Sequence, residues 1–178
     1  LKTDKKQQAL NAFKKASEME FDAKIQEDAY LNYAKLSYEI GNPYQSVPEI
    51  MNAYLAKYPN TSYKQEINTL LISSYITSKN YKEALVLLEK SKSPENKLAY
   101  QKVTFYRGLE LYTDGDFKGA YSLFKKSIAE NKDAKFSARA TFWKGETEYN
   151  LDQFEEAKLS FLQFLNSSEA STTPEFKN

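Results

Sequence analysis

The side chains with which this sequence could do chemistry are mainly carboxylates, because the chain contains neither cysteine nor histidine. Without these residue types there is no thiolate nucleophile, no Ser-His-Asp triad and no Cys or His ligand for zinc. Paired carboxylates occur, for example, at Glu27-Asp28, Glu146/Glu148 and Glu155-Glu156. An acid/base pair that cleaves glycosidic bonds must face across a cleft, which neighbours on one helix do not usually do. We therefore interpret these pairs as solvated helix faces.

Two further motifs are too incomplete to predict a site. Asp114-Gly115-Asp116 resembles part of a calcium loop, but the remaining ligand positions are missing, and Gly and Asp are common in turns. The glycines do not have the spacing of a phosphate-binding loop, and no Gly-Lys-Ser/Thr follows them. We therefore expect no catalytic residue, no metal site and no cofactor, and the chain is not expected to be an enzyme.

Charge and hydropathy exclude two other classes of partner. The 178 residues include 25 Lys and Arg against 24 Asp and Glu, a net charge of +1. This balance predicts no strong attraction to nucleic acid. No apolar run approaches the roughly 18 residues needed to span a bilayer, so no direct membrane insertion is expected. Because the first residue is Leu1 rather than Met, we expect a fragment of a longer protein.

The elements that must position any site are predicted to be helices. Only five Gly and five Pro interrupt the chain. Apolar residues recur at steps of three and four, as in the run Phe117, Ala120, Tyr121, Phe124 and Ile128. Such runs are separated by turn-forming segments such as 41–43, 59–61 and 114–116. The sequence therefore predicts an all-α fold with short turns.

A repeat of about 37 residues organises these helices. An aromatic residue, two others and a small or branched apolar residue occur four times: Tyr44-x-x-Val47, Tyr81-x-x-Ala84, Phe117-x-x-Ala120 and Phe154-x-x-Ala157. The last residues of these motifs are spaced by 37, 36 and 37 positions. Small residues recur in the preceding helix at Ala34, Gly108 and Gly145. A fixed period of this length indicates stacked helical repeats.

The pattern resembles the tetratricopeptide repeat (TPR), a helix–turn–helix unit in which a small residue of the first helix lets the second approach closely. The resemblance implies a single array, a right-handed superhelix (α-solenoid) of about nine helices. We assign an orphan second helix to residues 5–19, and expect 167–178 to be a loop toward a removed repeat. The four helix pairs are expected at 25–58, 62–91, 96–130 and 134–166.

The resemblance also implies a ligand groove, because the first helix of each TPR pair lines a concave surface. The groove positions of the family correspond to ten candidate residues: Lys35, Tyr38, Lys102, Phe105, Tyr112, Arg139, Phe142, Glu146, Tyr149 and Asn150. Phe105/Phe142 and Tyr112/Tyr149 recur 37 residues apart and would form an aromatic ladder. Trp143 and Tyr106 are equivalent to each other and would face either the groove or the neighbouring repeat. Packing between repeats is the alternative role for all these aromatic residues.

The expected function is a non-catalytic scaffold that binds a protein or peptide segment in this groove. The alternative is a structural spacer or an oligomerisation module, which would self-associate. Residues 140–146 and the segment 161–165 are similar to bacterial cell-envelope repeat proteins, of the Tol–Pal-associated periplasmic coordinator and outer-membrane assembly lipoprotein type. This similarity favours a location in the bacterial periplasm or cell envelope.

Overall fold

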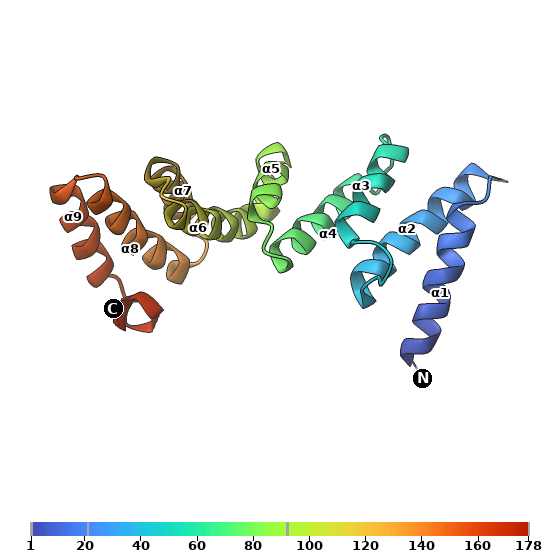
Figure 1. The fold of residues 1–178 in the computed structure, drawn as a ribbon, viewed down its shortest axis with the longest axis horizontal. Coiled ribbons are helices and arrows are strands. Elements are labelled where there is room, and N and C mark those ends of the chain that lie inside the picture. Colours follow the sequence, from blue (N-terminus) through green and yellow to red (C-terminus); the bar gives the residue numbers. More distant parts are fainter. Residues whose placement is uncertain (1, 21, 92, 178) are drawn as a thin grey trace. The chain divides into compact units, whose positions relative to one another are not determined.

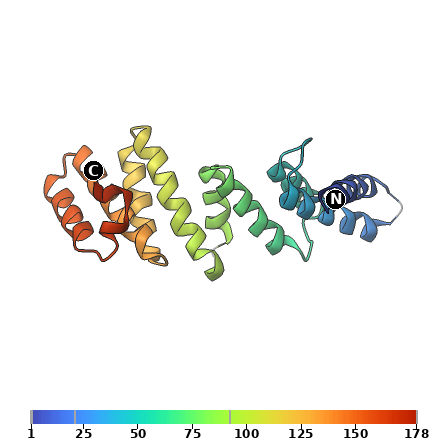
Figure 2. The same cartoon turned by 90° about the horizontal axis from the view of Figure 1, so that it is seen from below.

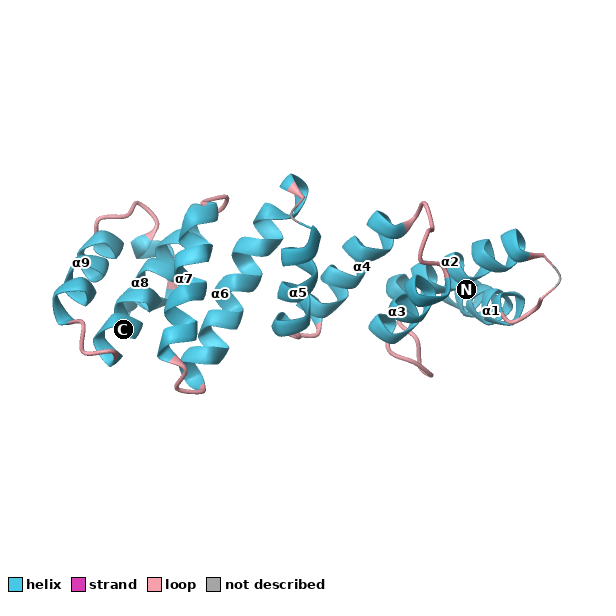
Figure 3. Cartoon of the chain, turned by 90° about the horizontal axis from the view of Figure 1, so that it is seen from above, coloured by secondary structure: helices cyan, strands magenta, loops and turns pink. Residues whose placement is uncertain are grey.

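The structure, a computed structural model, describes residues 2–20, 22–91 and 93–177. Nine α-helices and three short 3-10 helices make up these residues, joined by short loops and without a strand (Figure 3). The α-helices are α1 (Lys2–Ser17), α2 (Ala23–Ile40), α3 (Val47–Lys57), α4 (Lys64–Thr77), α5 (Tyr81–Ser91), α6 (Lys97–Thr113), α7 (Phe117–Glu130), α8 (Ala134–Asn150) and α9 (Phe154–Leu165). The 3-10 helices are η1 (Pro94–Asn96), η2 (Ala170–Thr172) and η3 (Pro174–Lys177). The predicted fold class, an all-α solenoid of helix–turn–helix units, is confirmed.

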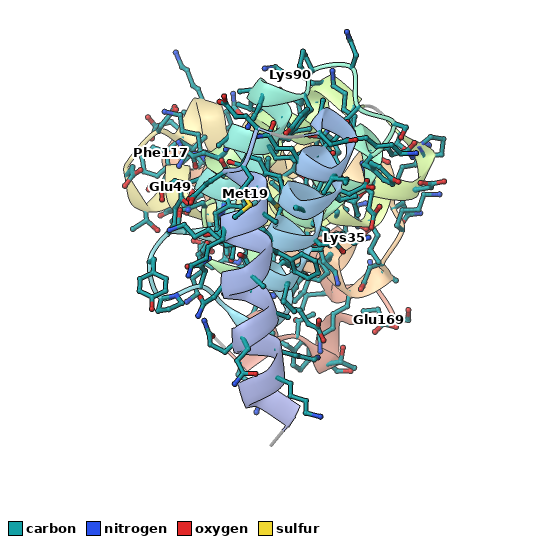
Figure 4. All side chains as sticks on the ribbon, turned by 90° about the vertical axis from the view of Figure 1, so that its right-hand side faces the viewer. Met19, Lys35, Glu49, Lys90, Phe117 and Glu169 are labelled. Carbon is teal, nitrogen blue, oxygen red and sulfur yellow. The ribbon has the colours of Figure 1, made fainter. Side chains whose placement is uncertain are left out.

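The chain divides into two compact units, Leu1–Asn80 and Tyr81–Asn178. In the first unit α1 and α2 lie side by side (Figure 4). The side chains of Ile50, Met51, Tyr54, Ile67 and Leu71 are fully buried there. Their burial removes apolar surface from water, which stabilises the unit by about 25 cal/mol per Å2 of apolar area.

The second unit holds α5 to α9, in which each helix packs mainly on the helix before it and the helix after it (Figure 1 and Figure 2). Phe105, Ala120, Phe124 and Ala140 are fully buried and form one cluster between α6, α7 and α8. The small residues Ala120 and Ala140 let the helices approach each other, and the two phenylalanine rings fill the remaining space.

Three helices begin at an aspartate whose side chain accepts hydrogen bonds from the first turn. Asp22 accepts from the backbone N–H groups of Lys24 and Ile25, and Asp116 accepts from that of Gly119. Asp133 begins α8 in the same way. These bonds satisfy N–H groups that have no partner inside the helix, and the negative charge is favourable at this end of the helix dipole.

The turn between α7 and α8 is held by the side chain of Gln101 on α6, which is fully buried. Its Nε2 donates to the backbone oxygen of Asp133 and to Ser137 Oγ, both at 3.0 Å. Its Oε1 accepts from the backbone N–H groups of Lys132 and Asp133, at 3.0 and 2.8 Å. All the hydrogen-bonding groups of this amide are therefore paired, which fixes where α8 begins relative to α6.

Candidate functional site

One face of the second unit brings together most of the groove residues expected on α6 and α8. We call it the α6–α8 face and define it by Lys102, Tyr106, Tyr112, Arg139, Trp143, Glu146 and Asn150. The helical spacing places the α8 members on one side of that helix, since they are three or four residues apart. Lys102 Nζ lies 5.5 Å from the ring centroid of Phe136, and Tyr106 packs edge-on against the same ring at 5.7 Å. The face therefore combines aromatic rings with two cationic side chains.

Arg139 is the best-anchored cation of the α6–α8 face. Its guanidinium carbon lies 4.6 Å from the ring centroid of Phe105, and its side chain is only 19% exposed. Arginine stacked on an aromatic ring is held in place both by cation–π attraction and by contact with the flat guanidinium group. The orientation of Arg139 is therefore largely set by α6 before anything binds to it.

A carboxylate from the chain itself is bound to Arg139. Arg139 Nε donates to both oxygens of Glu175, at 2.9 and 3.1 Å, and Trp143 Nε1 donates to Glu175 Oε1 at 3.0 Å. The Glu175 side chain is 4% exposed, so this ion pair is largely removed from water. Charge-assisted hydrogen bonds are stronger than neutral ones, and they gain strength where water is excluded. Arg139 and Trp143 thus form a binding position for one carboxylate.

The opposite end of the α6–α8 face is polar and acidic. Asn150 Nδ2 donates to the phenolic oxygen of Tyr112 at 3.0 Å, and the Tyr112 ring packs edge-on against Trp143 at 5.1 Å. Burial, first, and then the nearby Glu146 carboxylate raise the pKa of Tyr112 above its usual range. Tyr112 therefore stays neutral at physiological pH and keeps its hydroxyl as a hydrogen-bonding group.

Two of the predicted groove residues are packing residues. Phe105 is fully buried beneath Arg139 and against Phe124, so its expected place on a ligand surface was wrong. Phe142 is partly buried against the rings of Phe161 and Phe164 of α9, and so it points toward α9. Phe105 packs both on α7 of its own pair and on Phe136 of the next pair, so it has the alternative role of packing between repeats. Phe142 packs on α9, the second helix of its own pair.

Tyr149 is 58% exposed, but it lies away from Arg139, at the end of α8 where it packs edge-on against Phe154. The proposed aromatic ladder is therefore not a continuous strip. Of its four rings, Tyr112 is on the α6–α8 face and Tyr149 is exposed beside α9.

Lys35 and Tyr38, the two groove residues predicted on α2, both line a hollow of about 350 Å3 in the first unit. Lys35 lies on α2 (Figure 4), and its Nζ forms an ion pair with Glu66 of α4 at 2.5 Å. Phe13 of α1 and Leu70 of α4 supply apolar parts of the hollow's wall. The structure thus brings these two predicted residues together.

Sequence reasoning did not identify Glu175, and it left the orientation of Trp143 open. Glu175 lies in a Ser/Thr-rich segment that was expected to be a loop, whereas residues 170–172 and 174–177 form 3-10 turns, and η2 packs on α8. A carboxylate in an otherwise polar tail carries no signal of burial. Trp143 could have been noticed as the sole tryptophan of the chain, one turn from Arg139.

The arrangement most like a catalytic group is the trio Lys144, Ser160 and Glu148. Lys144 Nζ donates to Ser160 Oγ at 2.7 Å, and Ser160 Oγ donates to Glu148 Oε2 at 2.5 Å. A lysine beside a serine can activate it as a nucleophile. Ser160 is only 2% exposed, however, and its proton is directed to a carboxylate. The trio therefore serves to join α8 to α9.

The described residues contain neither a membrane-spanning helix nor a metal-binding cluster that would extend the site. Within residues 2–20, 22–91 and 93–177 there is no helix of the length and apolarity that crossing a membrane requires. The same part of the chain holds no group of three or more carboxylates placed to bind a metal ion.

Comparison with known proteins finds likeness at the level of the fold. No protein-family model matches the chain, and no curated protein sequence matches it. The solved structure of MamA AMB-1 is 21% identical, with a TM-score of 0.52 over 94% of this chain and 92% of that one. A mutant of MamA is 22% identical, with a TM-score of 0.56 over 99% and 90%. MamA MSR-1 is 20% identical, with a TM-score of 0.54 over 96% and 91%.

MamA is a TPR-like protein, so these matches support the TPR type of fold for this chain. They do not support the narrower similarity to the Tol–Pal-associated and lipoprotein types of repeat protein.

Proposed function

We propose that this chain is a non-catalytic scaffold that binds an acidic peptide or protein segment on the α6–α8 face. The observation that carries the proposal is the position of Glu175, whose carboxylate is held by Arg139 and Trp143. The tail 166–177 thus gives an internal example of a segment whose carboxylate is bound to α8. Binding by a partner would use the same donors.

The chemistry of the face suits such a ligand. Arginine and tryptophan are the residue types that most often anchor protein interfaces, because they combine large contact area with directed hydrogen bonds. Arg139 is already ordered by Phe105, so little conformational entropy is lost when a carboxylate binds. The net charge of the chain is only +1, so attraction for an acidic segment must come from local groups such as Arg139 and Lys102.

The charges also give the bound segment a direction. Lys102 and Arg139 lie toward the start of α6 and α8, whereas Glu146 and Asn150 lie toward the end of α8. An acidic residue is therefore favoured beside Arg139, and a hydrogen-bond donor or a cation is favoured beside Glu146.

A direct test uses the tail as a peptide in trans. In the Glu175→Ala protein the carboxylate position is free, and the single tryptophan of the chain, Trp143, reports its occupancy by fluorescence. A peptide with the sequence of residues 166–177 should produce a saturable change in that signal. The same peptide carrying Glu175→Gln should bind at least about tenfold more weakly, because the charge-assisted bonds are lost.

Two protein variants give the controls for this test. Arg139→Gln, combined with Glu175→Ala, should abolish binding of the tail peptide. Lys135→Gln removes an exposed cation from the same helix and should leave binding unchanged. Binding that survives Arg139→Gln would contradict the proposed site. A location in the cell envelope and self-association of the array stay predictions from the sequence.

A further inference from the structure

The tail 166–177 is attached to α8 by its side chains. After α9 the chain turns back toward α8, and η2 packs on that helix (Figure 1). Ala170 of η2 is buried against Ala138 of α8 and Phe164 of α9. Five residues later, the carboxylate of Glu175 is bound in the position that Arg139 and Trp143 form on α8. An apolar contact and an ion pair thus hold the tail in place.

The backbone hydrogen bonds of the tail are local. The N–H of Ala170 donates to the oxygen of Ser167 at 3.2 Å, and the N–H of Thr173 donates to the oxygen of Ala170 at 3.0 Å. These bonds shape the tail without fastening it to α8. Several side chains of the tail are exposed to solvent: Ser171, Thr172, Pro174, Phe176 and Lys177. The attachment to α8 therefore depends chiefly on Ala170 and on the ion pair of Glu175. Segments with few buried contacts open at a low cost in free energy.

The tail fills the position that the proposed function assigns to the carboxylate of a partner. Arg139 Nε donates to both oxygens of Glu175, and Trp143 Nε1 donates to one of them. The Glu175 side chain is only 4% exposed, so the tail covers these donors. A second carboxylate cannot reach the same two donors while the tail is bound.

We propose that the tail is an autoinhibitory segment, which closes the carboxylate position until an acidic segment of a partner displaces it. This inference rests on the proposed function, because it concerns the same donors on α8. The partner competes with a carboxylate of the chain itself. Its apparent affinity is therefore set by the fraction of molecules in which the tail has left α8.

The covalent connection gives the tail an advantage over a separate ligand. Glu175 follows the end of α9, at Leu165, by only ten residues. A segment on a short flexible linker has an effective concentration of the order of millimolar. A separate peptide that binds the open position with a dissociation constant of about 100 µM would therefore bind the closed chain about tenfold more weakly.

The test compares four forms of the full chain with one probe, a fluorescein-labelled peptide of residues 166–177, by fluorescence anisotropy. The first form is the unchanged chain, and the second is Glu175→Ala, which lacks the competing carboxylate. The third is Ala170→Arg, which places a large charged side chain where Ala170 is 2% exposed and so detaches the tail, while the donors on α8 are unchanged. The matched control is Ser171→Arg, which adds the same charge at the next residue, where the side chain is exposed.

Glu175→Ala and Ala170→Arg should each bind the peptide at least about tenfold more tightly than the unchanged chain does. Ser171→Arg should bind the peptide as the unchanged chain does. A second readout needs no peptide: acrylamide should quench the fluorescence of Trp143, the sole tryptophan, more strongly in Ala170→Arg than in Ser171→Arg, because the open tail uncovers the indole. Circular dichroism should show equal helix content for all four forms, and Glu175→Ala decides the question if Ala170→Arg has lost helix.

Equal binding of the peptide by the four forms would overturn autoinhibition and leave the proposed function intact. A folded Ala170→Arg variant that binds no more tightly than Ser171→Arg would also contradict the release of the tail. Binding by none of the four forms would refute the proposed function, and this inference with it. The two proposals therefore fail with different results.

Discussion

Gly145 on α8 lies so close to the ring of Phe161 on α9 that a β-carbon at Gly145 would stand 2.9 Å from the ring Cε1. The same contact occurs one repeat earlier, where a β-carbon at Gly108 would stand 2.8 Å from Cε1 of Phe124. Real β-carbons almost never approach another heavy atom this closely. The two helices of each of these pairs can therefore lie this close together only because Gly108 and Gly145 have no side chain.

Gly145→Leu should destabilise the second unit by at least about 1–3 kcal/mol, because the new side chain must displace the Phe161 ring or separate the two helices. Ala120→Leu should act similarly, since Ala120 is fully buried between α6 and α7. Urea denaturation measures both effects. Lys118→Leu, at an exposed position of α7, should stay within about 0.5 kcal/mol. Equal midpoints for the three variants would contradict the helix register.

Lys144→Met should destabilise the chain by about 3 kcal/mol, because it leaves the Glu148 carboxylate, which is 2% exposed, with no cationic partner. The double variant Lys144→Met with Glu148→Gln should recover part of the loss, since no buried charge remains. The measurement is the free energy of unfolding for the single variants and the pair. A single Lys144→Met variant as stable as the unchanged chain would show that water reaches Glu148.

Gln101→Leu should cost about 2–4 kcal/mol, because the backbone N–H groups of Lys132 and Asp133 lose a buried acceptor. The volume of the side chain is nearly unchanged, so the loss comes from hydrogen bonding rather than from packing. Amide hydrogen exchange should then become faster for residues 131–137. Exchange at the distant turn 114–116 should be unaffected, and general acceleration across the unit would contradict a local role for Gln101.

Tyr54 should make stability fall steeply at alkaline pH. Burial, first, and then the hydrogen bond and charge of Glu27 outweigh the hydrogen bond of Thr61 and raise the pKa of Tyr54 to about 12. In the unfolded chain the pKa of tyrosine is about 10. The contribution of the Tyr54 hydroxyl to the free energy of unfolding is therefore complete below about pH 10. It is lost as the pH rises toward 12, because the unfolded chain releases the Tyr54 proton at a lower pH than the folded chain does. The stability of Tyr54→Phe should decline less between pH 10 and 12, which chemical denaturation at several pH values would show.

The helices and their order were predictable from the sequence because two independent signals agree along the chain. Apolar residues at three- and four-residue steps indicate helices, and the recurrence of Phe117 and Ala120 at Phe154 and Ala157 indicates stacked pairs. Both signals come from local packing, which short stretches of sequence determine.

The candidate site was only partly predictable, because exposure depends on neighbours that a single helix does not reveal. The position of Phe105 on its helix is visible in the sequence, but its burial results from Arg139 and Phe136 of another helix. Glu175 is buried because Arg139 and Trp143, 36 and 32 residues earlier, face it. No local sequence pattern in the tail indicates the contact of Glu175 with these two residues.

The packing of each helix mainly on its sequence neighbours has a consequence for how the chain folds. Contacts between residues that are close in sequence need little loop closure, so chains of this type fold quickly for their length. Nucleation should begin where adjacent helices interlock most closely, at the glycine–phenylalanine contacts of α6 with α7 and of α8 with α9. Residues 1–80 would then fold and unfold with their own stability, as separate parts of repeat proteins often do.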